Sequence, residues 1–204
     1  MLRKEFAMKK SLLKIALLIL FLTLLTACSK QSDTKPVSAA PTGSHAEISL
    51  SYKNQPGMAS NQYAIWVEDE KGNHIKTIYA TKFTAKTGFS KRPESLPTWV
   101  AKSKIANMSE KQADAFTSAT PGSGTQKYTW DMTDQNGQKV PDGKYKILIE
   151  ASIFWKSKII YEAVLFTQEP SIKNIEVKQQ NMYTESKNLD MVTDVKITFI
   201  PKNK

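Results

Sequence analysis

The chain has 204 residues, with 29 Lys and Arg against 19 Asp and Glu and a formal net charge of +10. Its single cysteine, Cys28, excludes an internal disulfide, a thiolate metal cluster and a cysteine nucleophile in a domain that follows it. The lysines are scattered rather than clustered, which disfavours a nucleic-acid-binding protein.

The N-terminus predicts an export signal. From Met8, three lysines precede an uncharged run rich in Leu and Ile, Ile15 to Ala27, which is short for a permanent transmembrane helix. The run ends in "LTAC", which resembles the lipobox of bacterial lipoproteins. This resemblance implies cleavage before Cys28 and attachment of acyl chains to it; the alternative is an ordinary signal peptide with an accidental cysteine. Two or more acyl chains anchor a protein stably, whereas one binds only marginally.

Composition then divides the chain into three parts. Residues 1–27 are the expected signal, and they hold five of the bases and one of the acids, which leaves +6 for the mature part. Residues 28–45 are rich in Ser, Ala, Thr and Pro and lack aromatic residues, so we expect a flexible tether. Residues 46–204 have the length of a single domain with its own core.

Eight segments of this domain predict β-strands. In "QYAIWVED", Tyr63, Ile65 and Val67 share one face while Ala64 and Trp66 share the other, which favours a central strand. The segments span residues 46–53, 62–69, 74–80, 127–131, 144–155, 158–168, 172–179 and 192–200. Short strands separated by turn residues predict a mainly β fold, an Ig-like antiparallel β-sandwich.

Residues 82–126 contain no predicted strand and form a short helical or loop insertion. "PESLPTWVAKSKIA" predicts a helix capped by Ser95, with Pro97 in its first turn. "SEKQADAF" predicts a second helix, because Ser109 and Gln112 have the spacing of a capping box. Long excursions from a rigid scaffold often carry function, so this insertion is the expected location of a site.

Four segments occur in a recognisable order: "YAIWVED", "LPTWVAKS", "DAFTSAT" and "YTWDMTDQNGQKVPDGKYKILIEA". Together they resemble an uncharacterised bacterial family of predicted periplasmic proteins, a domain of unknown function, over roughly residues 46–155. Members of that family accompany PepSY-type membrane reductases and flavin transferases of the ApbE type. Residues 130–151 also resemble the Ig-like domain of flagellar hook-capping proteins, a likeness that concerns the fold. For the tail after Trp155 the sequence predicts strands only.

"DAFTSAT", Asp114 to Thr120, is the candidate site for a covalent cofactor. It resembles the motif Asp-x-x-Ser/Thr-Gly-Ala-Thr, on whose last Thr flavin transferases attach FMN, with Ser118 in the place of the glycine. The resemblance implies attachment at Thr120, with Thr117 as the second candidate hydroxyl and Asp114 holding the backbone or a metal-bound phosphate. An attached flavin ring needs an aromatic or apolar cover, for which Trp99 or Phe116 is the expected residue. The alternative is that Asp114 and Thr117 bond local backbone.

Other chemistry is sparse in the sequence. His45 falls in the tether, and His74 follows a turn. Asp131, Asp134 and Asn136 suggest part of a calcium loop, but no suitably placed glutamate follows, so turn chemistry is favoured. The run Glu68 to Glu70 borders a turn and is expected to be solvated. The four tryptophans are expected to pack in or beside the core. No catalytic triad, metal cluster or phosphate-binding loop is visible, so no catalysis and no metal are expected.

Two functional hypotheses remain. The first is a lipid-anchored accessory or binding protein on the periplasmic or cell-surface side of a bacterial membrane, serving a flavin- or iron-linked redox system without catalysis of its own. The second is an electron-transfer protein that carries FMN covalently at Thr120. Its partners would be a membrane reductase and a flavin transferase, and neither hypothesis involves nucleic acid.

Overall fold

The computed structural model describes residues 41–56 and 61–202, which belong to one compact unit beginning at Pro41. The expected signal segment and Cys28 lie outside the described residues. Within the described ranges, no helix is long and apolar enough to cross a membrane.

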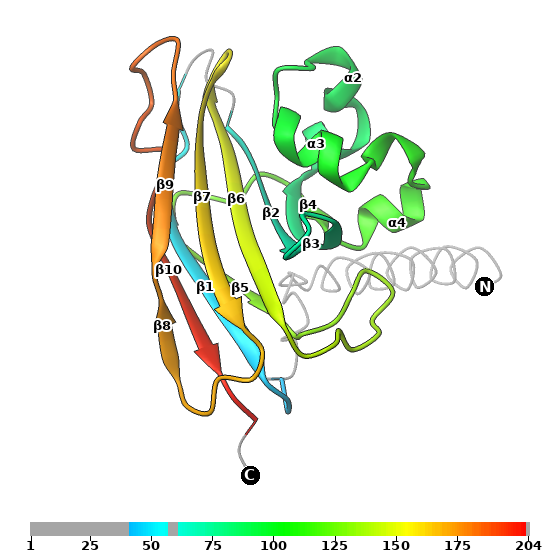
Figure 1. The fold of residues 1–204 in the computed structure, drawn as a ribbon. Coiled ribbons are helices and arrows are strands. Elements are labelled where there is room, and N and C mark those ends of the chain that lie inside the picture. The colour runs from blue at the N-terminus through cyan, green and yellow to red at the C-terminus, as the bar shows by residue number, and fades with distance from the viewer. Residues whose placement is uncertain (1–40, 57–60, 203–204) are drawn as a thin grey trace, which may run out of the picture. The chain divides into compact units, whose positions relative to one another are not determined.

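The first of two sheets has four strands in the order β5-β1-β10-β8, all antiparallel (Figure 1). Its strands are β1 (His45–Tyr52), β5 (Gly124–Trp130), β8 (Lys173–Ile175) and β10 (Val192–Ile200). Strand β1 begins one residue before the expected domain start, so His45 belongs to the sheet and its Nδ1 bonds the carbonyl of Gly43 at 2.9 Å.

The second sheet has six strands in the order β4-β3-β2-β6-β7-β9, and only the β3–β4 pair is parallel. The strands are β2 (Gln62–Asp69), β3 (His74–Thr81), β4 (Thr117–Ser118), β6 (Lys144–Phe154), β7 (Ser157–Phe166) and β9 (Val177–Met182). The predicted hairpin of β2 and β3 is confirmed, and so is the central place of β2, which pairs with β3 on one side and β6 on the other.

The main core lies between the two sheets, as expected for a sandwich. Tyr63, Ile65 and Val67 of β2 point into it, together with alternate residues of β1, β6, β7 and β10. Ala64 and Trp66 point to the opposite face and join a second, smaller cluster. The prediction of a mainly β sandwich is confirmed. Trp66, Trp99 and Trp130 are fully buried, but Trp155 is 48% exposed.

Two strand predictions need correction. The expected strand 172–179 is two strands, because the chain changes sheets at Glu176: Ile175 pairs with β10, whereas Val177 pairs with β7. The expected strand-free insertion also ends early, since Thr117–Ser118 forms β4 and β5 begins at Gly124. Both differences come from backbone pairing between distant segments, which leaves little trace in local periodicity.

The insertion between β3 and β4 forms a helical layer on the outer face of the six-stranded sheet (Figure 1). Its elements are the π-helical turn η1 (Thr84–Gly88), α2 (Phe89–Lys91), α3 (Pro97–Ser103), the 3₁₀ turn η2 (Ile105–Asn107) and α4 (Glu110–Asp114). The capping box of Ser109 and Gln112 is confirmed at the start of α4. The predicted cap by Ser95 is wrong: Leu96 precedes α3 without a side-chain cap, and Ser95 Oγ instead contacts Thr84 Oγ1 at 3.1 Å.

Carboxylates of the β5–β6 connection serve the turn. Asp134 Oδ1 accepts hydrogen bonds from the backbone N–H groups of Asn136 and Gln138, each at 2.9 Å. Asp131 Oδ1 accepts from the backbone N–H group of Thr133 at 3.3 Å within the same connection, and also from Lys76 Nζ of β3 at 2.7 Å. Turn chemistry is therefore the observed use of these residues, as predicted.

Candidate functional site

The helical layer is attached to the sheet by a buried carboxylate from strand β6. Glu150 is fully buried, and its two oxygens accept hydrogen bonds from the backbone N–H groups of Thr98 (3.2 Å) and Trp99 (2.8 Å). Lys158 Nζ lies 3.2 Å from the same carboxylate. The first N–H groups of a helix lack partners within it, and a negative charge is favourable there. Glu150 thus caps α3 from the sheet.

A second buried carboxylate joins β2 to the other end of α3. Glu68 is 4% exposed; its carboxylate accepts a hydrogen bond from Trp66 Nε1 at 2.9 Å and lies 3.3 Å from Lys102 Nζ. Lys102 also donates to the carbonyl of Gly72 at 2.7 Å. The expectation that Glu68 is solvated is wrong, because α3 packs beside it; the sequence predicted this helix but not its position against β2.

A chain of hydrogen bonds runs from the helical layer to His74. Trp99 Nε1 donates to Thr77 Oγ1 at 3.1 Å, and Thr77 Oγ1 lies 2.8 Å from His74 Nε2. Because Thr77 already accepts from Trp99, its hydroxyl is free to donate to an unprotonated Nε2. Burial lowers the pKa of His74 to about 4, so its imidazole is neutral at pH 7.

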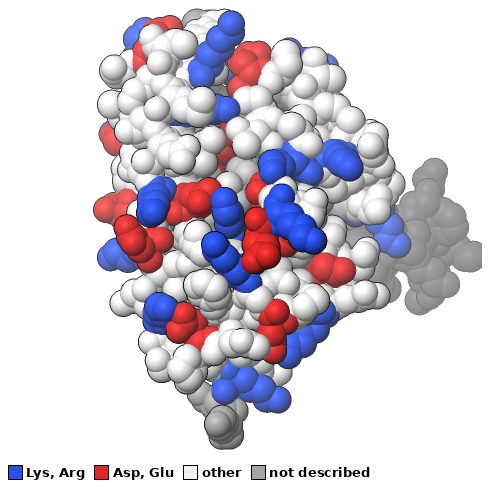
Figure 2. All heavy atoms as spheres, in the orientation of Figure 1, with Lys and Arg blue, Asp and Glu red and all other residues white. Residues whose placement is uncertain are grey.

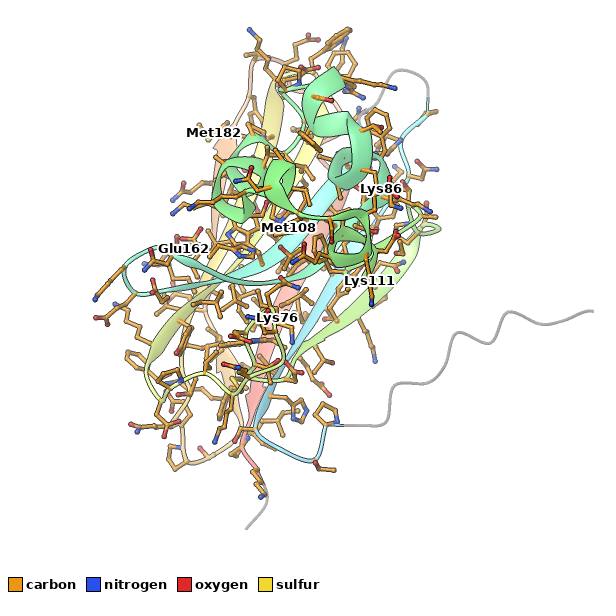
Figure 3. The ribbon with its side chains drawn as sticks, turned by 90° about the vertical axis from the view of Figure 1, so that its right-hand side faces the viewer. Lys76, Lys86, Met108, Lys111, Glu162 and Met182 are labelled. Carbon is orange, nitrogen blue, oxygen red and sulfur yellow. The ribbon has the colours of Figure 1, made fainter. Side chains whose placement is uncertain are left out.

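The exposed side of the helical layer carries a small groove. Its lining residues are Ala85, Lys86, Phe89, Ile105, Ala106, Met108, Ser109, Glu110 and Ala113. Figure 3 looks onto this layer and labels Lys86, Met108 and Lys111 on it. Apolar side chains thus form a patch with Lys86 and Glu110 beside it. The volume is about 80 Å³, below the roughly 300–1,000 Å³ typical of small-molecule pockets.

The Asp114–Thr120 segment begins beside this groove. Asp114 is the last residue of α4, and its Oδ1 lies 2.7 Å from Lys86 Nζ. That hydrogen bond holds the pKa of the Asp114 carboxyl below its usual value. The carboxylate is therefore occupied by Lys86. Among the described residues, no three His, Cys, Asp or Glu side chains gather to hold a metal ion.

The three hydroxyl residues of this segment have different environments. Thr120 is exposed, whereas Thr117 is partly buried and its Oγ1 has no hydrogen-bond partner among the described residues. The expectation that Thr117 bonds backbone is therefore wrong. Ser118 lies in β4 opposite Thr81, and its φ is not positive. A left-handed backbone, which would favour glycine, is absent at this position, so serine is unstrained there.

The aromatic residues expected to cover a flavin face inward. Trp99 is fully buried and Phe116 is 7% exposed, and their rings meet edge to face with centroids 6.3 Å apart. Both belong to the cluster under the helical layer. They hold α3 and α4 onto the sheet and present no free ring face to a group attached at Thr120.

A cluster of four tyrosines lies beneath the same loop, and sequence reasoning missed it. The rings of Tyr52, Tyr63, Tyr79 and Tyr128 are in mutual contact, with neighbouring centroids 4.8 to 6.4 Å apart. The hydroxyls of Tyr63 and Tyr128 share a short hydrogen bond, and Tyr79 donates weakly to the carbonyl of Ala119. Burial raises the pKa of Tyr52 to about 12. The signal was present, since these tyrosines occupy inward positions of four different strands.

Fold and site together define a mainly β, two-sheet sandwich with a helical layer on one face. Residues 44–184, more than half of the chain, match the family of predicted periplasmic proteins designated DUF2271. The chain belongs to this family and is a predicted periplasmic protein. The match extends beyond the 46–155 region that carried the resemblance, through β7 and β9.

Comparison with solved structures finds two crystal structures of truncated FlgD from the human pathogen Helicobacter pylori, one of them from strain 26695. Their sequence identities are 16% and 17%, and the TM-score is 0.32 for each. The match covers 81% of this chain and 88% of the FlgD chain in both cases. No curated protein matches the sequence.

Proposed function

We propose that this protein is a lipid-anchored extracytoplasmic accessory protein that binds a partner through its helical layer and catalyses no reaction itself. The observation that supports it is the apolar groove around Met108, on a layer fixed to the sheet by Glu150 and Glu68. The groove is too small for a typical cofactor but accommodates a side chain of a docking protein. The family resemblance favours a membrane reductase of a flavin- or iron-linked redox system as that partner.

Site-specific photocrosslinking tests this contact in the cell that makes the protein. A photoreactive residue in place of Lys111, which is exposed on α4, should give one discrete crosslinked membrane protein. Met108→Asp in the same chain should abolish that product, because a carboxylate in the groove opposes apolar docking. A photoreactive residue at Lys139, exposed in the β5–β6 connection, is the matched control. Equal crosslinking with and without Met108→Asp would refute the groove as the contact.

The lipid anchor needs a separate test, because Cys28 lies outside the described residues. Cells that produce the wild type or Cys28→Ala are labelled with an alkyne fatty acid. We expect label on the wild type only, since no other thiol exists in the chain. A mutant that labels like the wild type would contradict the anchor, and an ordinary cleaved signal would then be the better interpretation.

The second candidate function, covalent FMN, is favoured by the exposure of Thr120. Among the described residues its hydroxyl has no hydrogen-bond partner, and Ser118 occupies the glycine position of the motif without backbone strain. Thr120 Oγ1 would hold the FMN phosphate as an ester. Asp114, at the start of the same segment, is paired with Lys86 of η1. Bound FMN would supply reversible one- and two-electron transfer. Trp99 and Phe116 face inward, so neither would cover the flavin ring of an FMN attached at Thr120.

Flavin attachment is tested by co-expressing the exported protein with a flavin transferase and measuring in-gel flavin fluorescence. Fluorescence should be lost in Thr120→Val and retained in Thr117→Val. The second change is a well-matched control, because it removes a buried hydroxyl without a partner and keeps the shape of the side chain. A dark wild-type protein would leave only the accessory function.

A further inference from the structure

The turn between β6 and β7 displays an exposed tryptophan. Trp155 is 48% exposed and adopts a left-handed backbone with φ of 45°, an uncommon conformation for a bulky residue. The other three tryptophans are fully buried. The Phe154 ring meets the Trp155 ring edge to face at 6.2 Å. The fold therefore holds one large aromatic side chain outward at the end of its longest hairpin.

Further exposed apolar side chains lie at the same end of the sheet. Met182, Tyr183 and Leu189 are 51%, 38% and 41% exposed. Their segment is fixed against the hairpin, because Ser157 Oγ accepts from the N–H groups of Thr184 (3.0 Å) and Glu185 (2.9 Å). Trp155, Met182, Tyr183 and Leu189 together are called the hairpin-end patch below. The hydrogen bonds of Ser157 thus hold the segment that carries three of these side chains close to the end of the hairpin that carries Trp155.

Basic side chains accompany the hairpin-end patch. Lys156 is exposed next to Trp155 and has no ion pair with any described residue. Lys187 Nζ lies 4.7 Å from the centre of the Phe154 ring and 3.1 Å from the Glu185 carboxylate. Figure 2 shows basic and acidic residues interspersed over the neighbouring face, so this is not one large basic field. Aromatic and aliphatic groups beside lysines match the boundary between lipid headgroups and acyl chains.

We propose that the hairpin-end patch binds an anionic phospholipid surface, with Trp155 inserted at the headgroup level. The proposal rests on the extracytoplasmic, membrane-anchored location proposed above, but on neither the groove nor the flavin. Strand β1 begins at the end of the sandwich opposite the hairpin (Figure 1). Sixteen residues separate Cys28 from His45 and extend at most about 55 Å, whereas the hairpin strand β6 spans about 36 Å. The patch can therefore reach the membrane that would hold Cys28.

The test uses the mature chain from residue 28 with Cys28→Ser, so that no acyl chain contributes to binding. It is titrated with vesicles of phosphatidylglycerol and phosphatidylcholine, and with phosphatidylcholine alone. Trp155 is the only tryptophan that solvent reaches, so changes in emission and in acrylamide quenching report on this residue. We expect a blue shift and protection from quenching with the anionic vesicles, both weakened by high salt.

Variants separate the patch from nonspecific adsorption. Trp155→Ala should weaken vesicle binding, measured by sedimentation, about tenfold, and Lys156→Gln should weaken it about fivefold. Phe166→Ala, at the other end of β7 where the ring is 50% exposed, should leave binding unchanged. Equal binding to both vesicle types, no binding to either, or unchanged binding of Trp155→Ala would overturn the proposal. The Lys111 crosslink reports on the proposed accessory function independently, so the two can fail separately.

Discussion

The two interfaces of the six-stranded sheet are stabilised in different ways. Its inner face meets the four-stranded sheet through apolar side chains and tyrosines, and this cluster includes residues such as Ile149 and Phe199. Its outer face meets the helical layer through a smaller apolar cluster interrupted by buried polar groups, including Glu150, Glu68 and Thr77. Apolar burial therefore dominates between the two sheets, where the hydrogen bonds are those of tyrosine hydroxyls. The helical layer depends more on hydrogen bonds of buried charged groups with defined geometry.

This difference predicts that substitutions at the two interfaces affect the stability of the protein in different ways. Apolar packing tolerates small shifts, but a buried carboxylate that loses its partners is costly. Helices α3 and α4 have too few residues to be stable without tertiary contacts. We expect the layer to loosen as a unit while the sandwich stays folded, and the predictions below test that separation.

The largest effect should come from the sandwich core. Phe199→Ala removes a fully buried ring between the sheets and should lower the free energy of unfolding by about 3–5 kcal/mol. Urea unfolding followed by circular dichroism measures the loss. Because the core joins both sheets, the whole domain should unfold in one transition at a lower midpoint. A normal midpoint would mean that the four-stranded sheet contributes little.

The second largest effect should be confined to the helical layer. Glu150→Ala removes the cap of α3 and the partner of Lys158, at a cost of about 3 kcal/mol. Hydrogen–deuterium exchange should show faster exchange in residues 97–103, with β1 and β10 still protected. Glu150→Gln, which keeps one carbonyl acceptor, is the matched control and should loosen the layer less. Equal loss of protection in both sheets would show that layer and sandwich unfold together.

Most of the sandwich could be predicted from the sequence, because its strands alternate apolar and polar residues. Strand β10 is the clearest example, with Ile197 and Phe199 buried and Lys196 exposed between neighbours that face the core. Strand β2 is apolar on both faces, which predicted its central position. The change of sheet at Glu176 could not be predicted, because one continuous β-like segment pairs with two different partners. The periodicity of a strand specifies which of its faces is buried. Its pairing with distant strands decides which sheet it joins and in which register.

The candidate site was harder to predict than the fold. The capping box at Ser109 follows from local chemistry and was predicted. Glu150 and Glu68 were not, because each is buried by a helix more than thirty residues away along the chain. A carboxylate within an apolar strand, as in "ILIEASI", was the available signal for a partnered buried charge.

Mild acid should lower the stability of the protein through His74, which lies at the interface between the helical layer and the sheet. Burial lowers the folded-state pKa of His74 to about 4, below its unfolded value near 6.5, so the unfolded chain binds the proton more readily. The stabilisation is complete above pH 6.5 and is lost as the pH falls toward 4. We expect a loss on the order of 1 kcal/mol between pH 7.5 and pH 5, after allowing for the partial exposure of the ring.

Urea midpoints of the wild type and His74→Gln at the two pH values test this linkage. Glutamine retains an acceptor for the Thr77 hydroxyl but does not titrate, so the difference between the two proteins isolates His74. The same slope in both proteins would assign the acid sensitivity to other groups. Phe199→Ala should lower both midpoints and leave the slope intact, since it acts on the other interface.

The smallest effect should come from Ser118→Gly, in the strand that follows the helical layer. Glycine is useful where φ is positive, but Ser118 lies in an extended strand paired with Thr81. The change should therefore destabilise the protein by about 0.5–1 kcal/mol, through the greater freedom of the unfolded chain. It should also give no gain in flavin attachment at Thr120, because the backbone already has its strand conformation. Thermal unfolding and in-gel fluorescence, with Thr117→Val as the parallel variant, measure the two outcomes. A clear increase in fluorescence for Ser118→Gly would show that the transferase requires a different backbone from the one seen, and that β4 must detach from β3 before Thr120 can react.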